Sequence, residues 1–427
     1  MLIVGGTLFD GVSGDLVEDS GVEIVNGRIG RVGRRADFGH VAGTHDTIDA
    51  TGKFVMPGLI NMHDHLMMKY ALGSPYLATD RPFPDLMIHA VRLASVTLAQ
   101  GITTIRDMGT THEVALKVRG AIAAGDIQGP RVVACNHPIA VTGGHAYNMS
   151  VEVDGADGFR AAARAQLRAG ANFIKVMASH DPLPMMPGPE KTRAELTVDE
   201  MSAAFDVAHA WGTFAGCHVM GSVAIERVID AGVDIIDHGV YLNDRLAEKM
   251  AQQGTVLTPT YSAYVVQTIH PRFKRGEAWK AMHEVLIPGH HQAVAAAVKA
   301  GVTMVIGTDT TGCYAEEVAM LREAGLPARD ALLACTSNAA KAMRMDGELG
   351  TVQEGKLADV IVLSDNPLAD PYALETVELV IKDGRGVTPD GLTYAERQVR
   401  VGNMVELAHS PRQVRQRPGR FTVGFSG

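Results

Sequence analysis

The chain has 427 residues, of which 46% are hydrophobic and 20% are charged, and its formal net charge is −9. This composition is typical of a globular protein with a large core, and it excludes fibrous and membrane-spanning classes. The locally basic stretch 412–420 is typical of a solvated tail rather than a nucleic-acid surface. The chain start lacks a signal-peptide pattern and the four cysteines form no CxxC pair, so we expect a cytoplasmic protein with reduced thiols.

Residues 1–53 contain short alternating runs separated by Gly-rich turns, which predict a small antiparallel sheet. From residue 54 onward, strand patterns alternate with amphipathic helical patterns. Eight strands are predicted, at 54–62, 101–107, 131–136, 171–178, 213–219, 233–237, 255–260 and 302–308. Helices are predicted at 157–169, 198–211, 222–231, 244–253, 289–300, 315–324 and 329–343.

Strands that alternate with helices in this number predict an α/β fold, a (β/α)8 TIM barrel over residues 54–344. In such a barrel the functional groups lie at the C-terminal ends of the strands. Strand patterns return at 359–363 and 377–381. We therefore expect residues 1–53 and 345–400 to form one small β-sandwich domain, and residues 401–427 to form a C-terminal tail.

Two histidines, His63 and His65, end the first predicted barrel strand. Alternate residues of a strand share a face, so the two imidazoles lie roughly 7 Å apart along the backbone and could hold one metal ion. Four more polar residues interrupt or end apolar strands, and a single one of them would have a structural explanation. Together they predict a metal site at one mouth of the barrel: Lys175, His218, His238 and Asp309.

Lys175 distinguishes between one metal and two. An ammonium group would be repelled by divalent cations, and the apolar neighbours of Lys175 favour the neutral amine. A neutral amine can take up CO2 as a carbamate, whose two oxygens can bridge two metals about 3.5–4 Å apart. The alternative is an unmodified lysine that forms a salt bridge with Asp309 or another carboxylate at the mouth.

The sequence resembles the amidohydrolase superfamily over residues 1 to about 385. The resemblance rests on the six residues above and on the segments 57–65, 237–239, 307–309 and 350–359. Within the superfamily it is most similar to the prolidase (Xaa-Pro dipeptidase) and imidazolonepropionase-like branch, through residues 101–107 and 142–145.

The resemblance implies two divalent ions, expected to be Zn²⁺. His63, His65 and Asp309 would bind the more buried ion, His218 and His238 the more exposed one, and a CO2-derived carbamate on Lys175 would bridge them. Asp309 and His238 are then the expected catalytic residues, and a hydroxide shared by the two ions would attack a carbonyl carbon. The expected reaction is hydrolysis of a C–N bond in a dipeptide, an N-acyl amino acid or a related small amide.

Other substrates remain open, namely a cyclic amide or imidazolone, a phenylurea and an arylamide. A mononuclear deaminase and a non-catalytic scaffold are weaker alternatives, because the lysine is present and no predicted ligand is missing. The expected partner is a small-molecule amide, with no nucleic acid and no membrane. Members of the family often form symmetric assemblies, so we also expect a homo-oligomer.

Four residues are candidate substrate contacts: His145, His180, Tyr241 and Arg106. His145 could equally stabilise its Gly-rich loop, Tyr241 could pack, and Arg106 could form a structural ion pair. Met220 stands where the dipeptidases usually have a tyrosine, and residues 179–182 replace their Gly-rich turn. The Pro- and Met-rich segment 181–190 could contact an apolar substrate or act as a rigid connector.

Overall fold

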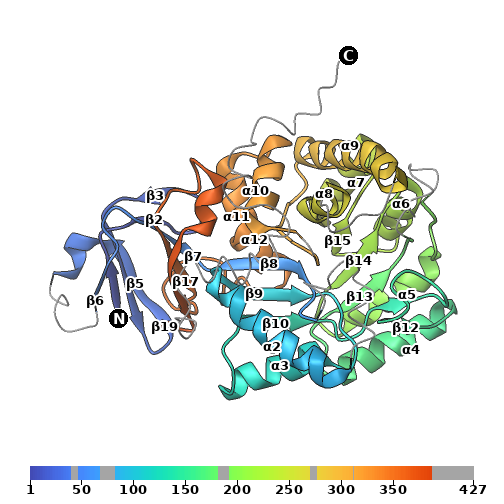
Figure 1. Cartoon of the computed structure of the whole chain (residues 1–427), viewed down its shortest axis with the longest axis horizontal. Helices are drawn as coiled ribbons and strands as arrows, with labels where there is room; N and C mark the ends of the chain where they lie inside the picture. The colour runs from blue at the N-terminus through green and yellow to red at the C-terminus, as the bar shows by residue number, and fades with distance from the viewer. Residues whose placement is uncertain (40–46, 68–81, 181–191, 270–276, 311, 387–427) are drawn as a thin grey trace, which may run out of the picture.

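The computed structural model describes residues 1–427 except 40–46, 68–81, 181–191, 270–276, 311 and 387–427. It consists of a small all-β part that holds the N-terminus and a larger α/β part beside it (Figure 1). Within the described ranges, no helix combines the length and the apolar character needed to cross a membrane.

The small part contains two sheets. In chain order, the first consists of β1 (Leu2–Val4), β4 (Ser20–Val25), β5 (Arg28–Arg34) and β6 (Thr47–Asp49). The second consists of β2 (Thr7–Phe9), β3 (Leu16–Val17), β7 (Phe54–Pro57), β17 (Val360–Leu363), β18 (Val377–Lys382) and β19 (Arg385–Gly386). Short 3-10 helices follow β5 and precede β18, at Arg35–Phe38 and Pro371–Glu375.

The two sheets share one apolar core. Val22 and Ile24 from β4 pack in the same cluster as Val55 from β7 and Val360 from β17. Burial of this shared apolar surface joins chain segments that are about 300 residues apart in sequence.

The α/β part is built on two parallel sheets. The first holds β8 (Leu59–Asp64), β9 (Ile102–Asp107) and β10 (Arg131–Ala134). The second holds β11 (Ile139–Ala140), β12 (Val151–Glu152), β13 (Ile174–Met177), β14 (Ala215–Val219), β15 (Ile235–His238) and β16 (Val256–Thr258).

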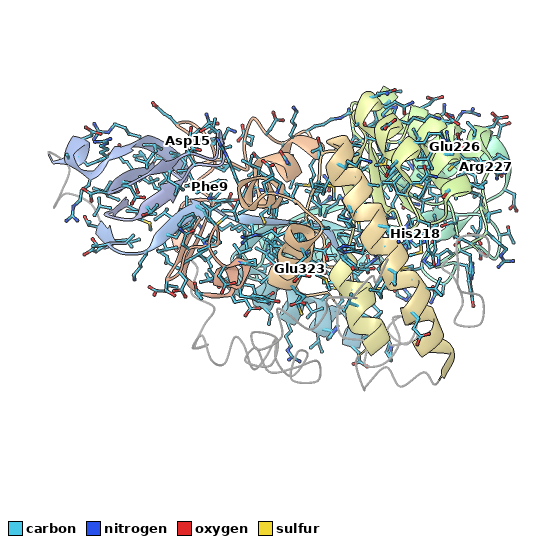
Figure 2. The ribbon with its side chains drawn as sticks, turned by 90° about the horizontal axis from the view of Figure 1, so that it is seen from above. Phe9, Asp15, His218, Glu226, Arg227 and Glu323 are labelled. Carbon is cyan, nitrogen blue, oxygen red and sulfur yellow. The ribbon has the colours of Figure 1, made fainter. Side chains whose placement is uncertain are left out.

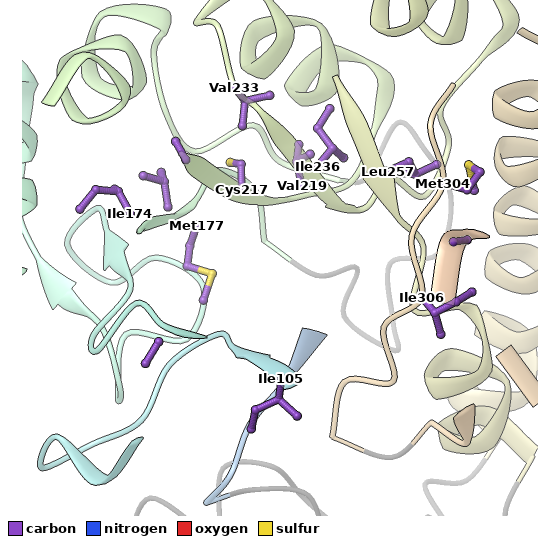
Figure 3. Close-up of a cluster of buried hydrophobic side chains, with 14 of the residues drawn as sticks. Ile105, Ile174, Met177, Cys217, Val219, Val233, Ile236, Leu257, Met304 and Ile306 are labelled. Atoms are coloured by element: carbon purple, nitrogen blue, oxygen red, sulfur yellow. The ribbon is translucent and has the colours of Figure 1, made fainter. Parts of the chain in front are cut away.

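Helices surround these strands (Figure 1). They are α2 (Phe83–Ala99), α3 (Val114–Ala124), α4 (Gly155–Arg168), α5 (Val198–Ala210), α6 (Ser222–Asp230), α7 (Asp244–Gln253), α8 (Tyr261–Ile269), α9 (Glu277–Ala300), α10 (Tyr314–Glu323), α11 (Ala328–Cys335) and α12 (Ser337–Ala342). The strands contribute buried residues such as Ile105, Ile174, Ile236 and Leu257 to the main apolar core (Figure 3). The predicted barrel with a flanking sandwich is thus confirmed as the fold class.

The barrel is not closed by continuous strand pairing. The segment 302–308, predicted as the eighth strand, is not a regular strand, but it lies between β16 and β8 and bonds to both. Leu257 N donates to Thr303 O over 3.0 Å, and Met62 N donates to Ile306 O over 2.7 Å. Between β10 and β13, the backbone bond from Asn172 N to Ala134 O, 2.7 Å long, bridges the two sheets.

The predicted first strand, 54–62, is divided at Gly58. Residues 54–57 form β7 and pair with β17 in the small part, and only β8 belongs to the barrel. A Cβ at Gly58 would lie 2.3 Å from Thr103 Oγ1, so only glycine fits where the chain passes from one sheet to the other. An uninterrupted apolar run in the sequence does not reveal this division.

Two helix predictions also differ from the structure. The helix predicted to begin at Gly289 begins at Glu277 and contains Pro288 in its interior. Proline is commonest in the first turn of a helix, which explains why the sequence predicts a start there. The helix predicted at 329–343 is divided at Thr336 into α11 and α12.

Candidate metal centre

The end of β8 and the segment after residue 308 bring three predicted ligands together. The nearest oxygen of Asp309 lies 3.8 Å from His63 Nε2 and 3.7 Å from His65 Nε2. One ligand atom from each of these residues lies within 4.8 Å of the others. Nitrogen and oxygen ligands bound to one zinc ion at about 2.0–2.1 Å lie roughly 3–4 Å apart, so the spacing fits a shared ion.

The ring orientation of both histidines also fits metal binding. His65 Nδ1 lies 3.0 Å from Gly109 O, within a hydrogen bond, whereas His63 Nδ1 lies 3.2 Å from a carboxylate oxygen of Asp237 but is not aligned for a hydrogen bond. Metal-binding histidines commonly donate one ring N–H to a carbonyl or carboxylate and keep the other nitrogen for the ion. The Nε2 atoms of both rings are the ones that approach Asp309.

His218 and His238 extend the same cluster. They lie on the adjacent strands β14 and β15, and their ring centroids are 4.6 Å apart. The ring of His238 lies 4.9 Å from that of His63, so the four predicted histidine ligands form one continuous group. His218 lies within the barrel part, far from Phe9 and Asp15 of the small part (Figure 2).

Two of the predicted ligands have unusual backbone conformations. The φ angles of His238 and Asp309 are 70° and 50°, in the left-handed region that side-chain-bearing residues seldom adopt. Such strain persists where the surrounding structure holds it, and it is common at functional sites. At His238 the chain leaves β15, and the His290 ring contributes to holding this conformation, since its Nε2 lies 3.2 Å from His238 O.

Lys175, as an unmodified lysine, forms a buried ion pair. Its Nζ donates to Asp237 Oδ2 over 2.6 Å, and both side chains are almost fully buried. Arg106 donates to the other oxygen of Asp237, and its Nε donates to Met62 O over 2.6 Å. The carboxylate partner of the lysine is therefore Asp237, whereas the sequence-based alternative named Asp309 or another carboxylate at the mouth.

Burial and charge act in opposite directions in this group. Burial alone would raise the pKa of Asp237, but the charges of Arg106 and Lys175 outweigh it and hold this pKa well below its usual range. Burial lowers the pKa of His63 to about 4, against the opposite influence of Asp309 and Asp237. Burial also lowers the pKa of His238. The His63 and His238 rings are therefore neutral near pH 7, which is the form that binds metals.

Arg106 is completely buried in the ion pair with Asp237. The geometry therefore favours a structural ion pair for Arg106 over a contact with substrate. Tyr241 packs against α9, where a Cβ at Gly289 would lie 2.4 Å from its ring. It lies three residues after the end of β15, and its φ of 69° is in the left-handed region.

His145 and His180 lie next to the candidate metal centre. The ring of His145 stacks on that of His218 with centroids 4.1 Å apart, and the ring of His180 approaches His145 edge-on at 5.9 Å. Glu195 connects them, because its carboxylate lies 3.0 Å from His180 Nδ1 and accepts the backbone N–H of His145 over 3.0 Å. The predicted contact segment 181–190 lies outside the described residues.

The sequence did not single out Asp237, Glu195, Thr260 or His290. Asp237 did carry a signal, because it is a charged residue inside the apolar run of β15. The roles of the other three depend on contacts between residues that are far apart in the chain. Thr260, for example, contacts the ring of His238 from the turn after β16.

Comparisons with known proteins agree with this geometry. A model of the amidohydrolase family matches residues 54–387. The chain is 28% identical to an ochratoxinase of Aspergillus niger over 407 residues, which cover 86% of this chain and 82% of the relative. It is 26% identical to an imidazolonepropionase of Halobacterium salinarum over 427 residues, which cover 87% and 93% of the two chains.

A crystal structure of a Xaa-Pro dipeptidase with bound methionine superposes with a TM-score of 0.78 at 29% identity, and covers 90% of this chain and 99% of the other. The predicted superfamily is confirmed by these matches. The chain belongs to the amidohydrolase family, a family of hydrolases.

Proposed function

We propose that this protein is a binuclear metal-dependent hydrolase that cleaves the C–N bond of a small amide, such as a dipeptide or an N-acyl amino acid. The observation that carries the proposal is the approach of His63, His65 and Asp309 to within 4.8 Å of one another, beside two further histidines and a buried lysine. In this proposal those three residues would hold one ion, His218 and His238 would hold the second, and a carbamate on Lys175 would serve as a ligand to both.

Formation of the carbamate changes the partners of Asp237. The ammonium of Lys175 first gives one proton to water, and the resulting neutral amine attacks the carbon of CO2. An N–C bond forms as one C=O π bond opens to the carboxylate, and a second proton leaves the nitrogen to water. Asp237 then loses its contact with the lysine ammonium but keeps the guanidinium of Arg106, which is buried with it. A buried carboxylate therefore still has a cationic partner after the lysine has become an anion.

The two ions, when bound, supply an activated water near neutral pH and polarise the substrate carbonyl. Asp309 is suited to move the proton in this reaction. Its side chain is 14% exposed, whereas those of His63 and His65 are 2% and 6% exposed, so the carboxylate is the most solvent-accessible member of this group. It can accept a proton from the attacking water and deliver it to the departing nitrogen, first as base and then as acid.

The names of the relatives support a carbonyl–nitrogen substrate. The match to a Xaa-Pro dipeptidase favours a linear peptide bond, and the match to an imidazolonepropionase favours a cyclic substrate as the second candidate. The ring of His145 stacks on that of His218, and on this contact we keep His145 as a candidate substrate contact beside the second ion. We place dipeptides and N-acyl amino acids first because both coverage and identity are highest for that structural match among those described above.

Bound metal per chain, measured by mass spectrometry of the purified protein, tests the proposal. Near two ions supports the binuclear hydrolase, near one supports a mononuclear deaminase, and none supports a scaffold. Turnover of a panel of dipeptides, N-acyl amino acids and cyclic amides by the metal-loaded protein then tests the substrate class. Absence of C–N hydrolysis across the panel would contradict the assignment.

The substitution Lys175→Ala tests the carbamate. We expect the metal content to fall below one ion per chain and turnover to fall by at least about 100-fold, because the shared anionic ligand is lost. Added short-chain carboxylates should restore part of both. An unchanged metal content would argue against the carbamate, and Lys299→Ala, which removes a lysine whose side chain is 75% exposed on α9, serves as the control that should leave metal content and turnover unchanged.

A further inference from the structure

The imidazole of His238 has a specific partner on its Nδ1 side. This atom lies 2.6 Å from Thr260 Oγ1, and both residues are almost fully buried. Thr260 lies in the turn between β16 and α8, two residues beyond the strand. His238 and Thr260 are 22 residues apart in the sequence, so folding of the chain brings them together.

The hydroxyl of Thr260 can only accept a hydrogen bond from His238. A hydroxyl has one proton to donate, and Thr260 Oγ1 donates it to Pro259 O over 2.7 Å. In the short contact between the two side chains, His238 Nδ1 must therefore be the donor and Thr260 Oγ1 the acceptor. The neutral ring of His238 consequently carries its proton on Nδ1 and keeps the lone pair of Nε2 available.

The surrounding structure keeps Thr260 in an unfavourable backbone conformation. Its φ is 52°, which is rare for a β-branched residue. The next two residues are fixed by Glu317 of α10, whose carboxylate accepts Tyr261 N over 2.9 Å and Ser262 N over 2.6 Å. Glu317 of α10 therefore fixes the turn by hydrogen bonds, and in this turn the Thr260 hydroxyl contacts His238.

We propose that Thr260 is a positioning residue that fixes the Nδ1–H tautomer of His238 and so directs Nε2 of this ring to the second metal ion. The inference rests on the proposed binuclear function. It implies that the strained turn at Thr260 is retained because the hydroxyl must reach His238, and that Glu317 supports it indirectly. Metal affinity of the second site, rather than folding, is the property that the hydroxyl controls.

The tautomer can be measured in the metal-free protein by two-bond ¹H–¹⁵N correlation of the histidine rings, with the His238 signals assigned from their loss in His238→Asn. We expect the Nδ1–H form alone in the parent and a mixture, or the Nε2–H form, in Thr260→Val. A parent in which His238 carries its proton on Nε2 would overturn the inference. This measurement requires no bound metal, so it remains informative if the proposed function fails.

Metal affinity is the second readout, measured by Zn²⁺ competition with a chromophoric chelator. Thr260→Val should weaken one of the two sites by about 10- to 100-fold, while the other site is unchanged. Thr260→Ser, which keeps the hydroxyl, should bind within about 3-fold of the parent. Equal affinities in Thr260→Val and the parent would contradict the inference, and if the parent itself binds fewer than two ions, the proposed function fails instead.

Two further variants separate positioning from structural damage. Thr258→Val changes the same residue type two positions earlier, where the buried Oγ1 has no hydrogen-bond partner among the described residues, so its metal affinity should equal that of the parent. Thr260→Gly removes the hydroxyl and relieves the positive φ together. We expect it to fold with an undiminished Tm and still lose affinity at one site, whereas a purely structural role predicts no loss of affinity in this variant.

Discussion

Asp309 differs from His63 and His65 in both exposure and conformation. Its side chain is the most exposed of the three-residue group, and its φ of 50° lies in the left-handed region. Its own Oδ1 accepts the N–H of Thr310 over 2.6 Å, which orients the carboxylate. These features suit a group that transfers a proton at the centre rather than one that only binds a metal.

The substitution Asp309→Asn should therefore lower the turnover rate far more than it lowers the metal content. An amide oxygen can still act as a neutral ligand, but it cannot take up and release a proton. We expect kcat to fall by about 10²- to 10⁴-fold, the usual contribution of general acid–base catalysis, while most of the metal is retained. Steady-state kinetics and metal content of the same sample check this. A variant with near-parental kcat would remove Asp309 from the mechanism.

Among single residues, the sequence identified as candidate ligands those that interrupt an apolar strand pattern. Lys175 and His218 lie inside short buried strands, so their polarity alone identified them. Asp237 gave the same signal but was noted only as part of a motif with His238. Thr260 is one hydroxyl among many in the chain, and its importance depends on a contact with a residue 22 positions away, which no local pattern indicates.

At the scale of elements, local signals decided what could be predicted. Helix α7 has the predicted bounds, since Asn243 caps its first turn and Gly254 ends it with a φ of 73°. The division of β7 from β8 at Gly58 was not predictable, because it depends on the proximity of Thr103 from a different strand. The interior Pro288 of α9 concealed the true start of that helix.

Glu317 connects two elements and makes folding stability depend on pH. Burial raises the pKa of this carboxyl to about 7, against the hydrogen bonds that it accepts at the start of α8. Between pH 4.5 and 7 the folded chain therefore holds one proton more at this site than the unfolded chain, so this group's contribution to stability falls as pH rises. A pKa rise of this size corresponds to about 3 kcal/mol of unfolding free energy.

The substitution Glu317→Gln should flatten the pH dependence of the unfolding free energy by about one proton between pH 4.5 and 7, because glutamine does not titrate. Urea unfolding of metal-free protein across this range measures the slope. Glu248→Gln on the exposed face of α7 provides the same chemical change as a control and should leave the slope unaltered. An identical slope in Glu317→Gln and the parent would show that the buried carboxyl does not titrate in this range.

For the whole molecule, the predicted ligands lie where the barrel is least regular. The segment 302–308 is held to β8 and β16 by scattered backbone bonds, and both Thr308 N and Asp309 N donate to His63 O, over 3.1 Å and 2.8 Å. Metal ions held between β8, Asp309 and the ends of β13, β14 and β15 would cross-link the two parallel sheets. The small β part has its own core and contributes none of the proposed ligands.

Removal of metal should accordingly loosen the barrel and leave the small part unchanged. A ligand that binds only the folded state adds about 2.7 kcal/mol to the free energy of unfolding when its free concentration is 100 times its Kd. Removal of metal from two such sites by a chelator should therefore lower Tm by several degrees. Hydrogen exchange should accelerate in β8, β13, β14 and β15 but not in β1 and β4, and added Zn²⁺ should reverse both changes. The double substitution His63→Asn with His65→Asn should respond much less to the chelator. If the parent releases its metal with no change in Tm or exchange, the ions do not cross-link the barrel.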